Sequence, residues 1–366
     1  MRKFRPVAVC AAFLALSFVP GSSADPVTRD RLSKYFGGWF SVCPGTSIST
    51  TEAPDIAVPG YPAYRVERHC DLKNREETAI TLVDPGKDEL FVGQVFYAED
   101  RRGHTFAAAS DLPNIQTALQ DAFGLPVAVR LEPGSRGALL PIRASIREAP
   151  EASASLAGFV SGDGAALLLG EFHPFGVSPE AWRERALAAA PGVRTSKGRF
   201  LVSAFIDFQC EKCRVRTPQV REFVAAHGGA LDVRFLPLVK VHNWSFAAAE
   251  RAAALAASSP ALYAKYEETV FPRAGSMNEK AATDLAADIA DAAGVREAFE
   301  AELSSGRARE RVLRDIELAM RLGSFGTPVF FYQGTYLTSE PSLAETFIQS
   351  RQSGAAGSGS HTGAPR

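Results

Sequence analysis

The feature that most constrains the fold is an apolar segment that stops at two cysteines separated by two residues. Residues 200–208 are rich in β-branched and aromatic side chains, and the segment is short enough for a buried strand. Residues 215–226 instead carry apolar side chains at helical spacing. The sequence therefore predicts a strand that leads into a helix, with Cys210 at the junction and Cys213 one turn further on.

The predicted position of Cys210 suits it for thiol chemistry. Unpaired backbone N–H groups and the positive dipole at a helix N-terminus stabilise a thiolate, so we expect a lowered pKa for Cys210. Cys213 lies within reach of a mixed disulfide formed at Cys210 and can resolve it. Glu211 would raise the pKa of Cys210 and Lys212 would lower it, so no redox potential follows. We predict that Cys210 is the catalytic nucleophile and Cys213 the resolving thiol.

Two other interpretations of this cysteine pair stay open. One is half of a zinc site, which would need a second pair of cysteine or histidine ligands. The remaining Cys and His residues are not arranged as such a pair, so we expect no metal site, and no cofactor is predicted. The other interpretation is an inert structural disulfide between the two cysteines.

Three further motifs accompany the cysteine pair. Pro218 falls inside the predicted helix, which it would kink. The stretch from Trp244 to about Leu322 is rich in alanine, a strong helix former. The tripeptide Gly326-Thr327-Pro328 precedes an apolar strand. With these motifs, residues from about 199 to 350 resemble the thioredoxin fold, and more closely the DsbA-like thiol-disulfide oxidoreductases, which insert a helical subdomain into it.

The resemblance implies how a substrate is held. In that family the proline of the last motif is cis and faces the two cysteines, a place that Pro328 would hold here. Thr327 would present its backbone to a bound substrate chain. The resemblance thus implies that Thr327 and Pro328 are substrate-binding residues.

The chain also departs from the family at one position. Many relatives carry a buried carboxylate six residues before the first cysteine, where this chain has Ala204. Proton transfer to or from Cys213 then needs another group or water. Asp207 and Glu211 are nearer in sequence, but the sequence does not place either of them for this task.

The N-terminus has the pattern of an export signal. Residues 1–5 are basic, residues 7–19 are apolar, and Ser22 and Ala24 are spaced as in a cleavage site. We therefore expect a signal peptide that is cut after Ala24, and a periplasmic or secreted protein. The apolar segment is too short for a retained membrane anchor, and most of it follows Cys10, which disfavours a lipid anchor there.

Removal of the signal leaves four cysteines, an even number that fits an oxidising compartment. If Cys210 and Cys213 pair with each other, Cys43 and Cys70 remain for each other by elimination. We predict a structural disulfide between Cys43 and Cys70. A second redox pair is the alternative, disfavoured because widely spaced cysteines lack activation by a helix terminus.

Length and charge set the domain organisation. A chain of 366 residues with 46% hydrophobic content can bury two cores, and a net charge of −1 implies no nucleic-acid partner. The expected parts are the signal peptide 1–24, an α+β domain 25–190, a linker 191–198, a thioredoxin-like domain 199–350 with a helical insert 243–322, and a disordered tail 351–366.

The N-terminal domain shows no catalytic pattern, since His69, His104 and His173 are isolated. Its predicted helices cover residues 27–36, 113–123 and 178–189, the first ended by Gly37-Gly38. Its predicted strands cover residues 63–69, 77–83, 89–99, 127–132, 139–148 and 165–172, with a loop at 43–62.

The C-terminal domain adds a strand at 231–241 and a hairpin at 329–337. His242 is interpreted as a strand-end residue that satisfies the next helix. Predicted helices cover residues 247–258, 261–271, 279–293, two segments within 295–322, and 342–350.

The sequence thus predicts an α/β protein with a thioredoxin-like fold, preceded by a separate α+β domain. The leading functional hypothesis is a DsbA-like dithiol oxidase that acts on protein or peptide thiols and is recycled by a redox partner. One alternative is a reductase or isomerase of the DsbC type, which would be a homodimer through residues 25–190. The other is a chaperone or binding module without catalysis.

Overall fold

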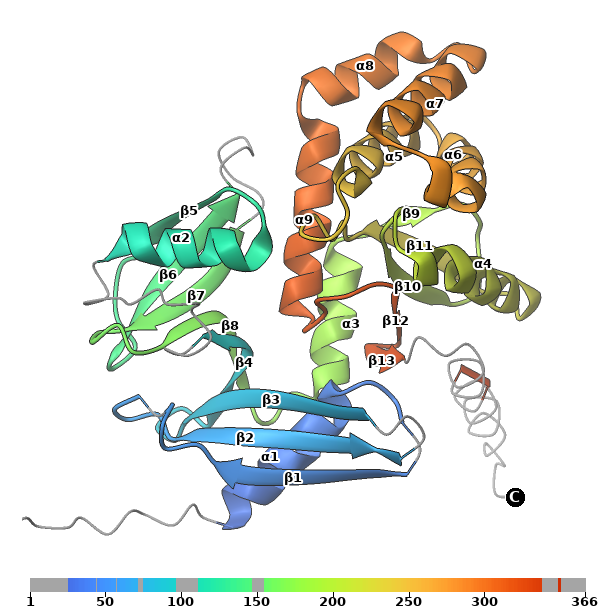
Figure 1. Ribbon diagram of the computed structural model, residues 1–366. Helices are drawn as coiled ribbons and strands as arrows, with labels where there is room; N and C mark the ends of the chain where they lie inside the picture. The colour runs from blue at the N-terminus through green and yellow to red at the C-terminus, as the bar shows by residue number, and fades with distance from the viewer. Residues whose placement is uncertain are drawn as a thin grey trace, which may run out of the picture.

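The computed structural model describes residues 26–43, 45–56, 58–71, 75–96, 111–146, 155–337 and 348–349. Two sheets organise these residues (Figure 1). The N-terminal sheet has eight antiparallel strands in the order β1-β2-β3-β4-β8-β7-β6-β5, and the C-terminal sheet has five in the order β13-β12-β10-β11-β9. The expected combination of an α+β domain with a thioredoxin-like domain is confirmed.

The N-terminal domain contains the same unit twice, a helix followed by four strands. The first unit consists of α1 (Pro26–Trp39), β1 (Thr46–Glu52), β2 (Ala63–Cys70), β3 (Arg75–Asp84) and β4 (Glu89–Phe96). The second consists of α2 (Leu112–Phe123), β5 (Val127–Leu131), β6 (Leu139–Ile146), β7 (Ser155–Ser161) and β8 (Leu167–Pro174). The helix α3 (Pro179–Ala189) then leads to the C-terminal domain.

The two units join through their last strands at the centre of the sheet. β4 and β8 pair antiparallel along their whole length, with Gly93 opposite Gly170. Both glycines have positive φ, and a Cβ on Gly93 would lie 2.1 Å from the Leu169 carbonyl oxygen. Only glycine allows this close approach of the two backbones.

The sheet separates on both sides of this central pair of strands. β3 meets β4 only at Val83–Leu90 and Asp84–Glu89, and β7 meets β8 only from Gly158 to Val160. Each outer set of strands therefore turns away from the centre and packs on its own helix, α1 or α2.

Three details of this domain differ from the sequence prediction. α1 does not end at Gly37-Gly38, because Leu32, Tyr35, Phe36 and Trp39 form one buried stripe at helical spacing that extends past the glycines. β1 lies within the expected loop as a mostly exposed edge strand of polar residues. β7, with a glycine and small residues at its centre, carries little strand signal.

In the C-terminal domain, the parallel strands β10 (Leu201–Ile206) and β11 (Ala230–Phe235) lie next to each other in the sheet. β10 also pairs antiparallel with β12 (Val329–Tyr332), which continues into β13 (Thr335–Leu337). β11 was expected to run to 241, but Pro237 cannot donate a ladder hydrogen bond, and the strand ends at Phe235. Within the expected linker, β9 (Val193–Arg194) pairs with β11.

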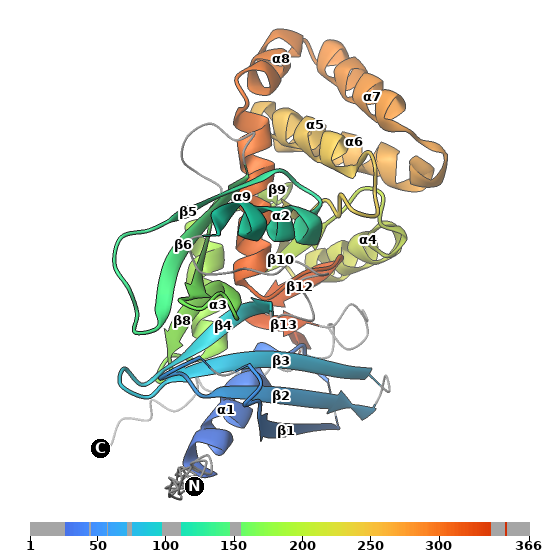
Figure 2. The ribbon, with the colours of Figure 1, turned by 60° about the vertical axis from the view of Figure 1, so that its left-hand side comes forward.

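Helices cover this sheet and form the insert (Figure 2). They are α4 (Glu211–Ala226), α5 (Ser245–Ser258), α6 (Pro260–Arg273), the short 3₁₀ helix η2 (Ala274–Ser276), α7 (Glu279–Ala292), α8 (Arg296–Ser304) and α9 (Arg307–Arg321). α9 is the long helix that also contacts β4, β7 and β8 of the N-terminal sheet.

The two domains pack closely around Arg183 of α3. This fully buried side chain donates to the carbonyls of Gly38 and Trp39 at the end of α1, and to that of Leu322 after α9. Its guanidinium lies over the Trp39 ring, 4.0 Å from the centroid. At Gly323, a Cβ would lie 2.6 Å from the Trp39 ring. The end of α9 is therefore fixed against the N-terminal domain.

Several predictions fall outside the described residues: the signal peptide with Cys10, His104, most of the final helix and the tail after 350. Among the helices that the structure describes, none is both long and apolar enough to cross a membrane.

Candidate functional site

The cysteine pair lies at the start of α4, directly after β10. Cys210 is the N-cap residue of α4, with its side chain at the edge of the core, and Cys213 is fully buried one turn later. Both cysteines are free thiols here. The loop between α9 and β12 meets them from the other side: the Thr327–Pro328 peptide bond is cis, and Cys210 Sγ lies 3.4 Å from the Thr327 carbonyl oxygen. The structure thus brings together the four residues to which the sequence analysis assigned catalysis and substrate binding.

The surroundings of Cys210 favour its thiolate. A hydrogen bond from the Cys213 side chain contributes most to lowering the pKa of Cys210 to about 6, against the opposing effect of burial. Hydrogen bonds from Thr327 and from the Cys213 backbone N–H act in the same direction. The Thr327 hydroxyl is buried and pairs with no other described oxygen or nitrogen atom, so it is available to the sulfur.

Cys213 has the opposite character. Burial raises its pKa well above the usual value, and its hydrogen bond to Cys210 adds to the rise. The Asp207 backbone N–H points at Cys213 Sγ over 3.4 Å, which only partly offsets the burial. The pair therefore holds one ionisable, partly accessible sulfur and one buried, protonated sulfur.

Asp207 is the buried carboxylate of this site. Its carboxylate is fully buried and accepts hydrogen bonds from the backbone N–H groups of Gln209 and Leu238, each at 2.7 Å. His242 Nδ1 lies 2.8 Å from the same carboxylate. The negative charge of Asp207 raises the pKa of Cys210.

The hydrogen bond of His242 to Asp207 was not predicted from the sequence. The histidine was interpreted as satisfying the next helix, but its ring binds Asp207 across 35 residues of sequence. Ala204, where many relatives have a carboxylate, is fully buried in β10 opposite Phe330. Asp207 was one of the two carboxylates that the sequence offered near the cysteines, yet nothing in the pattern identified its histidine partner.

Gln209 connects the active-site turn to the segment after β11. Its side-chain oxygen accepts from the Trp244 backbone N–H at 2.7 Å, and its amide nitrogen donates to Asn243 at 3.1 Å. Glu211, which was considered as a proton carrier, is exposed and pairs with Arg214 instead. The turn before Cys210 is therefore held on both sides by hydrogen bonds.

The remaining two cysteines lie in the N-terminal domain. Cys43 and Cys70 form a disulfide with Cα atoms 5.9 Å apart, joining the segment after α1 to the end of β2. Next to it, the Val42 backbone N–H donates to the Tyr336 carbonyl of β13 at 2.8 Å, so this segment runs along the C-terminal sheet. Within the described ranges, no group of three or more His, Cys, Asp and Glu side chains is arranged to hold a metal ion.

Comparisons with known proteins agree with this geometry. Residues 201–347 match the family model of the DSBA-like thioredoxin domain. No curated protein matches the chain at a significant level.

Similar solved structures cover about half of the chain. One is ScsC from Proteus mirabilis, with 15% sequence identity, a TM-score of 0.38, and coverage of 47% of this chain and 81% of that chain. Another is alpha-DsbA2 from Wolbachia pipientis, with 14% sequence identity, a TM-score of 0.38, and coverage of 47% of this chain and 97% of that chain. A third is BdbD from Bacillus subtilis, with 15% sequence identity, a TM-score of 0.39, and coverage of 46% of this chain and 95% of that chain.

The resemblance drawn from the cysteine pair and the Gly-Thr-Pro motif is therefore confirmed by the family model, over the same part of the chain. Residues 201–347 form a DSBA-like thioredoxin domain, a member of a family of thiol-disulfide oxidoreductases.

Proposed function

We propose that this protein is an exported dithiol oxidase, which introduces disulfides into protein substrates through Cys210 and Cys213. The observation that carries this proposal is the unequal environment of the two sulfurs, one with a pKa lowered to about 6 and one with a raised pKa. Stabilising the Cys210 thiolate stabilises the reduced protein. The oxidised protein is then the stronger oxidant, which favours transfer of a disulfide to the substrate.

The reaction would run in two exchange steps. A substrate thiolate attacks Cys210 Sγ of the Cys210–Cys213 disulfide, a mixed disulfide forms, and Cys213 leaves as a thiolate that takes up a proton. The second substrate thiol, once it has lost its proton, attacks the first substrate sulfur of the mixed disulfide, and Cys210 leaves as the stabilised thiolate. The substrate loses two electrons and two protons, and the enzyme cysteines are reduced.

Cys210 and the cis-proline loop would hold the substrate during these steps. The Thr327 carbonyl lies 3.4 Å from Cys210 Sγ, so a chain bound to the Thr327 backbone places its own cysteine next to the sulfur that it attacks. Each turnover leaves the enzyme reduced, so the proposal includes a redox partner that accepts the two electrons.

The direction of exchange is tested by equilibrium with glutathione. We expect a reduction potential for Cys210–Cys213 above about −200 mV, in the range of oxidising exchange proteins. A value near that of thioredoxin, about −270 mV, would instead favour a reductase. The Cys43→Ala/Cys70→Ala double variant should give the same potential, because its redox-active pair is intact.

Export forms part of this proposal. The basic and apolar segments before Ala24 support it, as does the Cys43–Cys70 disulfide, which is stable in an oxidising compartment. Mass spectrometry of the protein recovered from the periplasm or medium should show a chain that begins at Asp25. An uncleaved chain confined to the cytosol would contradict export.

The homodimer predicted for an isomerase of the DsbC type is a separate expectation. Gel filtration of the full chain would test it, together with an assay on a scrambled-disulfide substrate. A dimer that rearranges scrambled disulfides would favour the isomerase. If the protein is instead a chaperone without catalysis, the Cys210→Ser/Cys213→Ser variant should still suppress the aggregation of an unfolded protein.

A further inference from the structure

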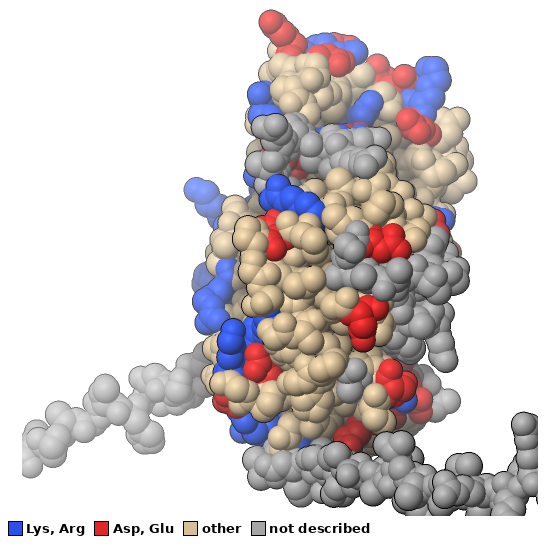
Figure 3. All heavy atoms as spheres, turned by 90° about the vertical axis from the view of Figure 1, so that its left-hand side faces the viewer, with Lys and Arg blue, Asp and Glu red and all other residues tan. Residues whose placement is uncertain are grey.

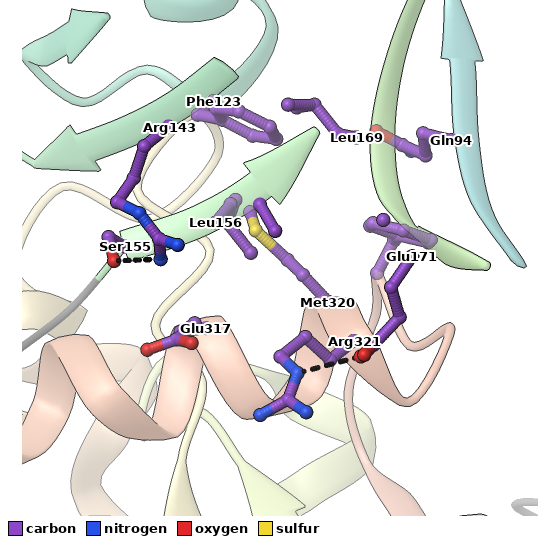
Figure 4. A pocket seen from close by; sticks show the side chains of 13 residues that line it. Gln94, Phe123, Arg143, Ser155, Leu156, Leu169, Glu171, Glu317, Met320 and Arg321 are labelled. Atoms are coloured by element: carbon purple, nitrogen blue, oxygen red, sulfur yellow. Dashed lines mark hydrogen bonds and ion pairs between the residues drawn. The ribbon is translucent and has the colours of Figure 1, made fainter. Parts of the chain in front are cut away.

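A pocket of about 240 Å³ lies between the N-terminal sheet and α9 (Figure 4). In Figure 4, side chains of β4, β7 and β8 face those of α9, and Met320 points toward Leu156. Its lining combines apolar residues with charged ones at the margins.

The pocket exists because β7 leaves β8. Their register ends at Gly158 opposite Leu169, and if it continued it would place Ala157 opposite Gly170 and Leu156 opposite Glu171. β8 stays paired with β4 along this part, so only its other edge faces the gap. Two strand edges of the described sheet therefore border the pocket without pairing to each other.

Among the described residues, one contact of α9 with the backbone of β7 is made by Glu317. The Glu317 carboxylate accepts a hydrogen bond from the backbone N–H of Ser155 at the start of β7. Burial raises the pKa of Glu317, which is consistent with its position inside the interface. The segment around Ala157, further along β7, is exposed in the pocket wall.

The chemistry of the lining suits a polypeptide segment. Two guanidinium groups, of Arg143 and Arg321, are balanced by the carboxylates of Glu171 and Glu317. Arg321 pairs with Glu171 at 3.1 Å, so the lining does not select a strongly charged ligand. Phe123, Leu156 and Met320 offer an apolar surface for a side chain, and the half-buried Gln94 amide has no hydrogen-bond partner among the described residues. Strand edges and a free amide can bind main-chain groups of an extended peptide.

One residue of the pocket lining belongs to the loop that carries Thr327 and Pro328. Phe325 lines the pocket with 46% of its surface exposed, and it belongs to the same loop as Thr327. Two residues of extended chain span at most about 7 Å. A peptide that passes Cys210 along the Thr327 backbone can therefore continue over Phe325 into the pocket.

We propose that this interdomain pocket binds an extended segment of the protein substrate, adjacent to the cysteine that undergoes exchange. The inference deepens the proposed function and rests on it. It gives the N-terminal domain a direct part in recognising unfolded, reduced chains, because β4, β7 and β8 supply most of the pocket wall.

The test is a tryptophan that fills the pocket. Ala157→Trp places a large ring in the pocket wall at an exposed strand position, and Ala298→Trp is the matched control on the exposed face of α8. We expect Ala157→Trp to raise KM for a reduced, unfolded protein about fivefold to tenfold, the effect of losing one important contact. Its rate with a small monothiol such as glutathione should stay unchanged, and Ala298→Trp should change neither.

A second variant covers the case in which Ala157→Trp does not fold. Phe325→Ala truncates a side chain that is nearly half exposed, so it should fold, and we again expect a raised KM for the protein substrate only. Normal exchange with glutathione and unchanged KM for the protein in both variants would overturn the pocket inference and leave the proposed function intact. Failure of the unmodified protein to exchange with either substrate would overturn both.

Discussion

Identical side chains at Cys210 and Cys213 differ in acidity because their surroundings differ. Cys210 caps a helix and receives hydrogen bonds, whereas Cys213 is buried below it. The lowered pKa of Cys210 favours the reduced, folded protein above pH 9, the ordinary pKa of the thiol. This contribution to stability is lost as the pH falls toward 6, where the folded-state thiolate takes up its proton.

The hydrogen bond from Cys213 can be tested by a matched pair of variants. Cys213→Ala removes the donor that contributes most to lowering the pKa of Cys210, so this pKa should rise toward 9. Cys213→Ser keeps a donor and should hold the pKa close to that of the unmodified protein. The measurement is the rate of alkylation of Cys210 as a function of pH. Equal midpoints for the two variants would contradict this origin of the shift.

Asp207 opposes the thiolate, and its charge can be removed with little change in shape. Asp207→Asn should lower the pKa of Cys210 further, because the carboxylate charge raises it. The variant also weakens hydrogen bonds from Gln209, Leu238 and His242, so the free energy of unfolding should fall by about 2 kcal/mol.

A substitution at His242 distinguishes the effect of Asp207→Asn on the pKa of Cys210 from its effect on the free energy of unfolding. His242→Phe removes the ring nitrogen but keeps the Asp207 charge, so it should destabilise the protein without the same decrease in the pKa of Cys210. Thiolate absorbance and urea unfolding measure the two quantities. A rise in the pKa of Cys210 in the Asp207→Asn variant would contradict the claim that the Asp207 charge raises this pKa.

At the scale of elements, the site depends on how the ends of α1, α3 and α9 meet. The loop that carries Thr327 and Pro328 follows α9 directly, and the carbonyl at the end of α9 is held by Arg183 together with two carbonyls of α1. The N-terminal domain is thereby linked to the loop that contacts Cys210.

Replacing Arg183 should therefore destabilise both domains together. Arg183→Met removes the hydrogen-bond donor of three carbonyl groups that lie in the domain interface. We therefore expect the free energy of unfolding to fall by about 3 kcal/mol or more. The exposed Arg185 of the same helix is the control, and Arg185→Met should change this value by less than about 0.5 kcal/mol. Similar losses in the two variants would show that Arg183 does not hold this junction.

At the scale of the whole molecule, the Cys43–Cys70 disulfide lies in a different domain from Cys210 and Cys213. Cys43→Ala/Cys70→Ala opens a loop with a sequence separation of 27, and the free energy of unfolding should fall by roughly 3 kcal/mol. The rate of exchange at Cys210 should not change, as a glutathione assay on the folded variant would show. A large loss of exchange would favour the alternative that Cys43 and Cys70 are a second redox pair.

The surface agrees with the balanced composition. On the face shown in Figure 3, most of the described Lys and Arg residues lie toward the left edge with a few acidic residues among them, and other Asp and Glu residues lie toward the right, separated by uncharged surface.

The sequence predicted the parts of this protein that depend on local pattern. The strand-to-helix junction at Cys210, the helical insert and the Gly-Thr-Pro motif are each carried by neighbouring residues, and the family model confirms the domain they indicate. The pairing of β4 with β8 joins strands separated by many residues, and neither strand alone reveals its partner. The Asp207–His242 contact, the burial of Arg183 and the interdomain pocket likewise arise only from tertiary packing.

The ionisation of Cys210 tests the account most directly. The fully reduced chain should be titrated by the ultraviolet absorbance of its thiolates, with the Cys210→Ser variant measured beside it. We predict an ionisation with a midpoint near pH 6 that is absent from the variant. A first midpoint at or above pH 9, or one near pH 6 that persists without Cys210, would contradict it.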